Sequence, residues 1–298
     1  MRDIPFVDAH VHLWDLERIS YPWLTPPFAD DGPNGSVAPI AKTYLLDDYL
    51  ADAEGWTIAG MVHVDAGAAA SGALDETEWL QNMADERGLP SGIVAFASLD
   101  DPDVERLLAA HAEHRNVRGI RHIVNWHADP RRTYCARDVT ADPIWQRGFD
   151  RLGKYGLSFD LQCYPGQFAN VAQAIVRNPE VPVILNHCGM PVDGLDQWRA
   201  EIERLTALPN VAVKMSGFGF IERAWKPEAM LPFARELIDR FGPDRVLFAS
   251  DFPTDKLFCD FAQILETFTE IASGFGDDER RAMFGRNADR IYRLGLGV

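Results

Sequence analysis

The chain has 298 residues, of which 47% are hydrophobic and 25% charged, a composition typical of a globular protein with a sizeable core. Its 45 acidic residues outnumber 29 lysines and arginines, and the formal net charge of −16 argues against nucleic acids and anionic membranes as partners. No apolar run reaches the roughly 18–20 residues of a membrane span, the N-terminal residues contain no signal-peptide core and the four cysteines are scattered. We therefore expect a cytoplasmic protein.

Short apolar runs alternate with longer amphipathic stretches along the whole chain. The expected strands are Phe6–His12, Ile58–Val64, Gly92–Ala97, Val117–Ile123, Leu157–Cys163, Val181–His187, Val211–Met215 and Val246–Ser250. The expected helices are Leu46–Glu54, Leu74–Arg87, Val104–His114, Pro143–Tyr155, Gln167–Asn178, Gln197–Ala207, Pro227–Phe241 and Asp260–Ala272.

Several of the expected strands are apolar on both faces, as parallel strands covered by helices should be. Eight strand–helix units in a chain of this length fit a closed α/β barrel. A doubly wound sheet is the alternative, but no Gly-rich phosphate-binding fingerprint follows any strand. We predict a single (β/α)8 TIM-barrel domain over residues 1–298, with the loop Gly32–Pro39 over the catalytic face.

The strongest local motif is His10-x-His12 in the first expected strand. Side chains alternate along a strand, so both imidazoles are predicted to point into the barrel, where two such rings can bind a metal such as zinc. The alternative is a pair of packed histidines without metal.

Two further polar residues end expected strands. His187 ends the sixth strand, and Asp251 follows the eighth. Catalytic residues of a barrel gather at the C-terminal ends of its strands, and the first and eighth strands are neighbours, so we expect Asp251 beside His10 and His12. A carboxylate there can bind a metal or accept a proton from water, although Asp251 could also cap a turn.

Taken together, these residues resemble the amidohydrolase superfamily, and within it a lactonase-like branch that includes fuconolactonase, pyrone dicarboxylate lactonase and galactarolactone isomerase. The resemblance covers nearly the whole chain. It rests on His10-x-His12 with Leu13–Trp14–Asp15, Tyr21–Pro22–Trp23–Leu24, Glu78–Trp79–Leu80, Gly119–Ile120–Arg121–His122, Asn186–His187–Cys188–Gly189, Val213–Lys214–Met215–Ser216–Gly217, Ser250–Asp251–Phe252–Pro253, Gly285–Arg286–Asn287–Ala288 and Ile291–Tyr292–Arg293–Leu294.

The resemblance implies that His10, His12, His187 and Asp251 line the centre of the site and form the ligand set of at most one divalent metal, zinc by preference, with a metal-free site left open. It speaks against a two-metal site, because Arg121–His122 stands on the fourth strand in place of a bridging carboxylated lysine or glutamate. Gln162 likewise stands where many members carry a histidine on the fifth strand.

Six arginines and a single acid, Asp129, lie between Arg115 and Arg137 in this otherwise acidic chain. This segment spans the fourth strand and the loop after it, so it could make the electrostatic potential locally positive and bind an anionic substrate. The alternative is that these arginines form ion pairs on the surface. The candidate substrate contacts are Arg121, Gln162, His63, Tyr164, Trp126 and Lys214.

The predicted function is hydrolysis of a small lactone, derived from a sugar acid or from aromatic degradation. Asp251 takes a proton from water, the hydroxide attacks the ring carbonyl, and the histidines, with or without zinc, stabilise the oxyanion. The alternatives are lactone isomerisation, metal-dependent decarboxylation of a muconate-type acid and ligand binding without catalysis. The expected partner is a small lactone or carboxylate, and a homo-oligomer is left open.

Overall fold

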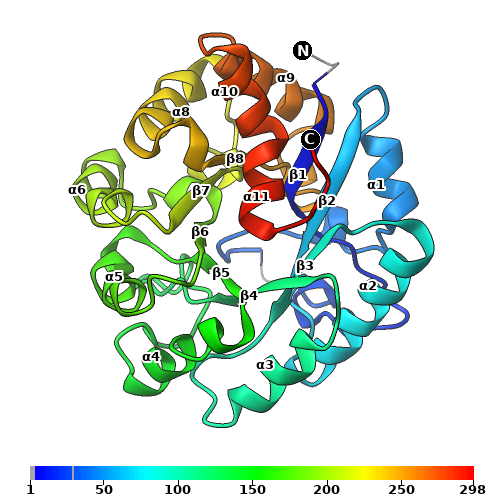
Figure 1. The fold of residues 1–298 in the computed structure, drawn as a ribbon, viewed down its shortest axis with the longest axis vertical. Coiled ribbons are helices and arrows are strands. Elements are labelled where there is room, and N and C mark those ends of the chain that lie inside the picture. Colours follow the sequence, from blue (N-terminus) through cyan, green and yellow to red (C-terminus); the bar gives the residue numbers. More distant parts are fainter. Residues whose placement is uncertain (1–3, 29) are drawn as a thin grey trace.

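The computed structural model describes residues 4–28 and 30–298, and eight parallel strands form its centre (Figure 1). Each strand pairs with the next in chain order, from β1 to β8. The strands are β1 Phe6–Val11, β2 Ile58–Val64, β3 Gly92–Phe96, β4 Val117–Ile123, β5 Ser158–Gln162, β6 Val183–Leu185, β7 Val211–Met215 and β8 Val246–Phe248.

The sheet closes where the residues after β8 meet β1. The backbone N–H of Asp251 donates to the carbonyl of His10 at 2.9 Å, and the N–H of His12 donates to the carbonyl of Phe252 at 2.8 Å. Parallel bridging between Val11 and Phe252 continues the same contact. The prediction of a single (β/α)8 barrel is confirmed.

Helices surround the strands on the outside (Figure 1). They are α1 Leu46–Asp52, α2 Ala73–Arg87, α3 Val104–Ala112, α4 Pro143–Phe149, α5 Phe168–Arg177, α6 Leu195–Thr206, α7 Phe218–Ile221, α8 Pro227–Phe241, α9 Phe261–Ala272, α10 Asp277–Arg281 and α11 Asn287–Tyr292. Among the described residues no helix is both long and apolar enough to cross a bilayer.

Most expected elements are present with shifted ends. The helix expected over 143–155 ends at Phe149, and a separate short turn covers Leu152–Tyr155. Near the end of the helix, Gly148 packs so closely against the backbone that a Cβ there would lie 2.1 Å from the carbonyl oxygen of Leu99. The expected sixth strand ends early, because His187–Gly189 form a 3-10 turn. The short helices α7, α10 and α11 were not predicted.

The core has two parts. The larger cluster packs the outer faces of the strands against the helices. The smaller one fills the barrel with short and branched side chains such as Val62, Val94 and Ile184, and Ala288 and Tyr292 of α11 join it. α11 crosses one end of the barrel (Figure 1). The polar residues of the candidate site lie at or just after the C-terminal ends of the strands.

Candidate active site

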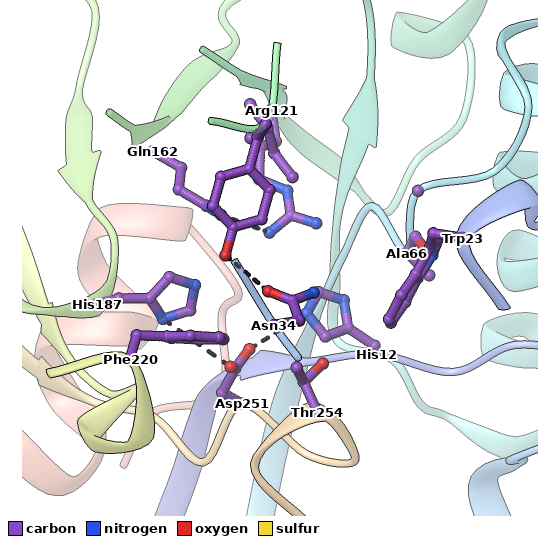
Figure 2. A pocket seen from close by; sticks show the side chains of 13 residues that line it. His12, Trp23, Asn34, Ala66, Arg121, Gln162, His187, Phe220, Asp251 and Thr254 are labelled. Atoms are coloured by element: carbon purple, nitrogen blue, oxygen red, sulfur yellow. Dashed lines mark hydrogen bonds and ion pairs between the residues drawn. The ribbon is translucent and has the colours of Figure 1, made fainter. Parts of the chain in front are cut away.

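A cavity of about 230 Å³ opens at the C-terminal ends of the strands (Figure 2). Its walls combine residues at or just after the ends of six strands with residues from the long loops that follow. The lining residues are His12, Trp23, Asn34, Ala66, Gly67, Arg121, Ile123, Tyr134, Gln162, His187, Phe220, Asp251 and Thr254. A barrel enzyme carries its chemistry at this end.

Two histidines and one carboxylate converge beside this cavity. The Nε2 atoms of His10 and His12 lie 3.2 Å apart, and Oδ1 of Asp251 lies 3.4 Å from the first and 3.2 Å from the second. All three side chains are at least 95% buried. The structure thus brings together the residues that the closure between the first and eighth strands predicted to be neighbours.

The hydrogen bond made by the other ring nitrogen of His12 sets its tautomer. Nδ1 lies 2.7 Å from the carbonyl oxygen of Val64, so Nδ1 carries the hydrogen and donates it. Burial, followed by the charge of Arg121, lowers the pKa of His12 to about 3. The ring is therefore neutral at physiological pH, with an Nε2 lone pair that faces the Asp251 carboxylate.

His187 and Asp251 both have left-handed backbone conformations, with φ of 50° and 59°. This conformation costs a non-glycine residue on the order of 1–3 kcal/mol and is concentrated at functional sites. Nδ1 of His187 lies 3.0 Å from Oγ of Ser216 and 4.0 Å from Oδ2 of Asp251. The ring also packs on Gly217, where a Cβ would lie 2.7 Å from Nδ1. The histidine is therefore held in one orientation against the carboxylate.

The Asp251 carboxylate is incompletely paired. Its Oδ2 is buried and accepts no hydrogen bond from an N–H or hydroxyl group of the described residues. The neighbouring carboxyl of Asp255 can supply a proton only when it is protonated, and burial raises the pKa of Asp255 well above its usual value. Burial also raises the pKa of Asp251, while the charge of His187 opposes this shift. Asp251 is thus a buried carboxylate that burial makes more basic, and its Oδ2 has no N–H or hydroxyl donor among the described residues; both properties suit a general base.

Arg121 of β4 reaches the cavity from the opposite wall. Its Nε donates to Oδ2 of Asp65 at 3.0 Å, and NH2 donates to the Asp65 carbonyl. NH1 donates to Oε1 of Gln162 at 3.2 Å and lies 3.5 Å from Nε2 of His10. Asp65 therefore fixes the plane of the guanidinium, and its positive charge is directed toward the centre of the site.

Lys214 lies behind His10 and not in the cavity lining. Its side chain is fully buried, forms an ion pair with Asp160, and its Nζ lies at hydrogen-bond distance, 3.2 Å, from Nδ1 of His10. The hydroxyl of Tyr292 donates to both Asp160 oxygens, at 2.9 and 3.0 Å. The structure places Lys214 as a support for His10, whereas the sequence analysis expected a substrate contact.

Three other expected substrate contacts lie outside the cavity lining. His63 is buried and donates from Nε2 to the carbonyl of Leu13 at 3.1 Å. The Tyr164 hydroxyl donates to the carbonyl of Arg132, and Trp126 is 39% exposed. Of these three residues, Tyr164 lines a neighbouring cavity, and the contacts of all three with substrate stay predictions.

The arginines of the segment 115–137, apart from Arg121, do not line the cavity either. Most of them pair with acids from other segments or within the same loop, as Coulomb attraction in an acidic protein favours. The pairs are Arg115 with Asp85, Arg131 with Asp129, Arg132 with Asp193, and Arg137 with Asp100 and Asp142, whereas Arg118 donates to backbone carbonyls.

Polar or aromatic lining residues that the sequence did not mark include Asn34, Tyr134, Phe220 and Thr254. The hydroxyl of Tyr134 donates to Oδ1 of Asn34 at 2.6 Å, so the loop after β4 is joined to the loop after β1 by two residues that line the cavity. The position of the loop Gly32–Pro39 over the site agrees with the expectation for it. No sequence motif marks Tyr134 or Phe220, because the folded conformation of the segments after β4 and β7 brings them to the cavity.

The side chains of His10, His12 and Asp251 could hold a single divalent metal. One ligand atom from each of His10, His12 and Asp251 lies within 4.8 Å of the others. His12 fits directly, because its Nδ1–H is held by a carbonyl and its Nε2 is free. His10 fits through Nε2 only when its Nδ1 carries the hydrogen, and Lys214, whose pKa burial lowers, then accepts this hydrogen as a neutral amine. Nitrogen and carboxylate donors of this kind suit zinc.

Comparisons with known proteins agree with this geometry. A family model described as "Amidohydrolase" matches residues 7–294. The chain is 42% identical to the uncharacterized protein y4mH of Sinorhizobium fredii, over 99% of this chain and 100% of that one. It is 26% identical to an L-fucono-1,5-lactonase of Burkholderia multivorans, over 97% and 96%. A solved amidohydrolase of Burkholderia multivorans with bound zinc superposes with a TM-score of 0.80 at 25% identity, covering 97% of this chain and 99% of that one.

Proposed function

The chain belongs to the amidohydrolase family, and from this premise we propose that it is a hydrolase that opens a small lactone. One observation carries the proposal: an incompletely paired, buried carboxylate, Asp251, stands among three histidines beside a cavity, with the Arg121 cation on the opposite wall. The similarity to an L-fucono-1,5-lactonase over nearly the full length of both chains supports a lactone as the substrate class.

Asp251 acts as the general base. Its raised pKa and free acceptor capacity suit it to take a proton from a water molecule between the carboxylate and the lactone carbonyl. The resulting hydroxide attacks the carbonyl carbon, and a tetrahedral oxyanion forms. When the ring C–O bond breaks, Asp251 returns the proton to the departing alkoxide, so the carboxylate is regenerated.

The cations and hydrogen-bond donors of the site stabilise the oxyanion. Arg121 is fixed by Asp65 before substrate binds, and His187 is fixed by Ser216, so neither must reorganise during the reaction. A zinc ion held by His10, His12 and Asp251, with His187 beside them, would polarise the carbonyl and add positive charge where the oxyanion forms.

A panel of sugar-acid and aromatic-degradation lactones tests the proposal, assayed with and without chelator and accompanied by zinc analysis of the purified protein. Hydrolysis in ¹⁸O-labelled water must place one label in the product carboxylate, whereas isomerisation between two hydroxyls need not. Ring opening without label would contradict hydrolysis. Release of CO₂ from a muconate-type acid would favour decarboxylation instead.

A further inference from the structure

A second cavity, of about 260 Å³, adjoins the catalytic one. Tyr134 and Phe220 line both, so the two cavities share a wall. Three arginines, Arg131, Arg132 and Arg223, face this outer cavity, which we call the vestibule. Tyr134, which lies between the two cavities, donates its hydroxyl hydrogen to Oδ1 of Asn34 at 2.6 Å.

The charge of the vestibule differs from that of the rest of the chain. Acids outnumber lysines and arginines by 45 to 29 over the whole sequence, yet none of the described residues that line the vestibule is acidic. Arg131 pairs with Asp129, and Arg132 pairs with Asp193 at 3.0 Å and with Asp129 at 4.0 Å. Their charges are therefore largely balanced.

Arg223 supplies the unbalanced charge. Among the described residues no carboxylate forms an ion pair with it, and its terminal nitrogens donate instead to the carbonyls of Asn34 and Pro33, each at 3.1 Å. Its guanidinium also lies 5.7 Å from the ring centre of Phe258. Carbonyls and a ring orient the group without neutralising it, and three of its five N–H donors remain for a ligand.

A fixed guanidinium with free donors binds a carboxylate well, because the fork of N–H groups matches two oxygens. One unbalanced positive charge also matches a singly charged carboxylate better than a doubly charged phosphate. Because Tyr134 and Phe220 line both cavities, a ligand that extends past these two side chains would contact the vestibule and the catalytic cavity together.

We propose that the vestibule, through Arg223, binds a carboxylate carried by the substrate, so that the preferred substrate is a lactone with a second, acidic group. This inference rests on the proposed lactonase function and refines its substrate class. It assigns the anionic group to Arg223, which lies after α7, and not to the arginines of the loop after β4.

The test compares matched pairs of 1,4-lactones that differ only in a terminal CH₂OH or carboxylate, namely the glucono and glucaro, galactono and galactaro, and mannono and mannaro lactones. The native enzyme is expected to have a kcat/KM at least about ten-fold higher for the acidic member of the best pair. Arg223→Gln should bring this ratio close to one, mainly through KM. Arg204→Gln is the matched control: Arg204 pairs with Glu201 on α6, and this variant should keep the native ratio.

Two results would overturn the proposal. One is equal or better turnover of the neutral lactones by the native enzyme. The other is an equal loss for both members of a pair in Arg223→Gln, which would mean that Arg223 only supports the loop at Pro33 and Asn34.

A binding measurement separates failure of the proposal from failure of the proposed function. If no lactone of either class is opened, the lactonase function fails, and thermal unfolding with the open-chain diacids and monoacids still tests the vestibule. Glucarate should then raise the melting temperature more than gluconate in the native protein, and this difference should vanish in Arg223→Gln. Equal shifts in the native protein would reject the carboxylate site.

Discussion

Two buried polar clusters meet at His10. On the cavity side lie His12, His187 and Asp251. Two of these residues, His187 and Asp251, have left-handed backbone, and Oδ2 of Asp251 accepts no hydrogen bond from an N–H or hydroxyl group of the part of the chain that the structure describes. On the other side, every charged or hydroxyl group of Lys214, Asp160 and Tyr292 has a partner within the cluster or on His10.

The difference in hydrogen bonding indicates which cluster takes part in the chemistry and which one positions His10. Folding leaves buried polar groups unpaired only at a cost, so an unsatisfied cluster needs another reason to persist, such as a substrate, a water or a metal. A satisfied cluster needs no ligand. We therefore assign chemistry to the Asp251 side of His10 and positioning to the Lys214 side, and the following changes test this division.

Removing the base should have the largest effect. Asp251→Asn keeps the shape of the side chain but removes the charge and basicity, so kcat/KM is expected to fall by about 10³- to 10⁴-fold. Thermal unfolding should remain cooperative, because the fold does not depend on this charge. The control is Asp196→Asn, at an exposed carboxylate of α6. Near-native turnover by Asp251→Asn would reject the assignment.

Breaking the supporting cluster should mainly affect stability. Lys214→Met leaves the Asp160 charge buried without its partner, which is expected to lower the free energy of unfolding by about 3–5 kcal/mol. The double variant Lys214→Met/Asp160→Asn should recover much of this loss, because no buried charge remains unpaired. Denaturant unfolding measures both. An additive loss in the double variant would show that the two residues do not stabilise the fold as a pair.

Oε1 of Glu76, like Oδ2 of Asp251, has no hydrogen-bond partner among the described residues, but Glu76 does not line the cavity. It therefore tests what such a buried carboxyl costs when no catalytic role is assigned to it. Burial raises its pKa from 4.5 to about 8. Between these values the unfolded chain releases a proton that the folded protein keeps, so stability should fall as pH rises, by up to about 1.4 kcal/mol per pH unit. Glu76→Gln should remove this slope between pH 6 and 8. An unchanged slope would place its origin elsewhere.

Zinc should stabilise the cavity cluster specifically. At a free concentration of 100 Kd, one bound ion raises the free energy of unfolding by about 2.7 kcal/mol, which a thermal shift detects. His12→Gln should abolish the shift, because it removes the ligand whose lone pair is free. A shift that survives in His12→Gln would mean that zinc binds at another site.

Much of the architecture could be predicted from local pattern. The lengths and apolar character of the strands indicated the barrel, and the position of Asp251 after the eighth strand indicated its neighbours, because closure of a parallel barrel leaves few arrangements. The inward direction of both histidines depends, in addition, on an irregularity in the strand pairing. The pairing of β1 with β2 is irregular between Asp8 and Val11, so that Val7 and Ala9 fill the barrel while His10 and His12 also reach its centre.

The sequence alone determined the fold, the family and the polar residues at the ends of the strands, because these depend on periodicity and on motifs within a few residues. Tertiary structure decided which of the other polar residues reach the cavity. It placed Lys214 behind His10, turned Tyr164 toward a carbonyl and brought Tyr134 over the site. It also left Arg223 without a carboxylate among the described residues, while the loop arginines found theirs. The partner of a long side chain depends on distances between segments that lie far apart in the chain, and only the packed fold sets those distances.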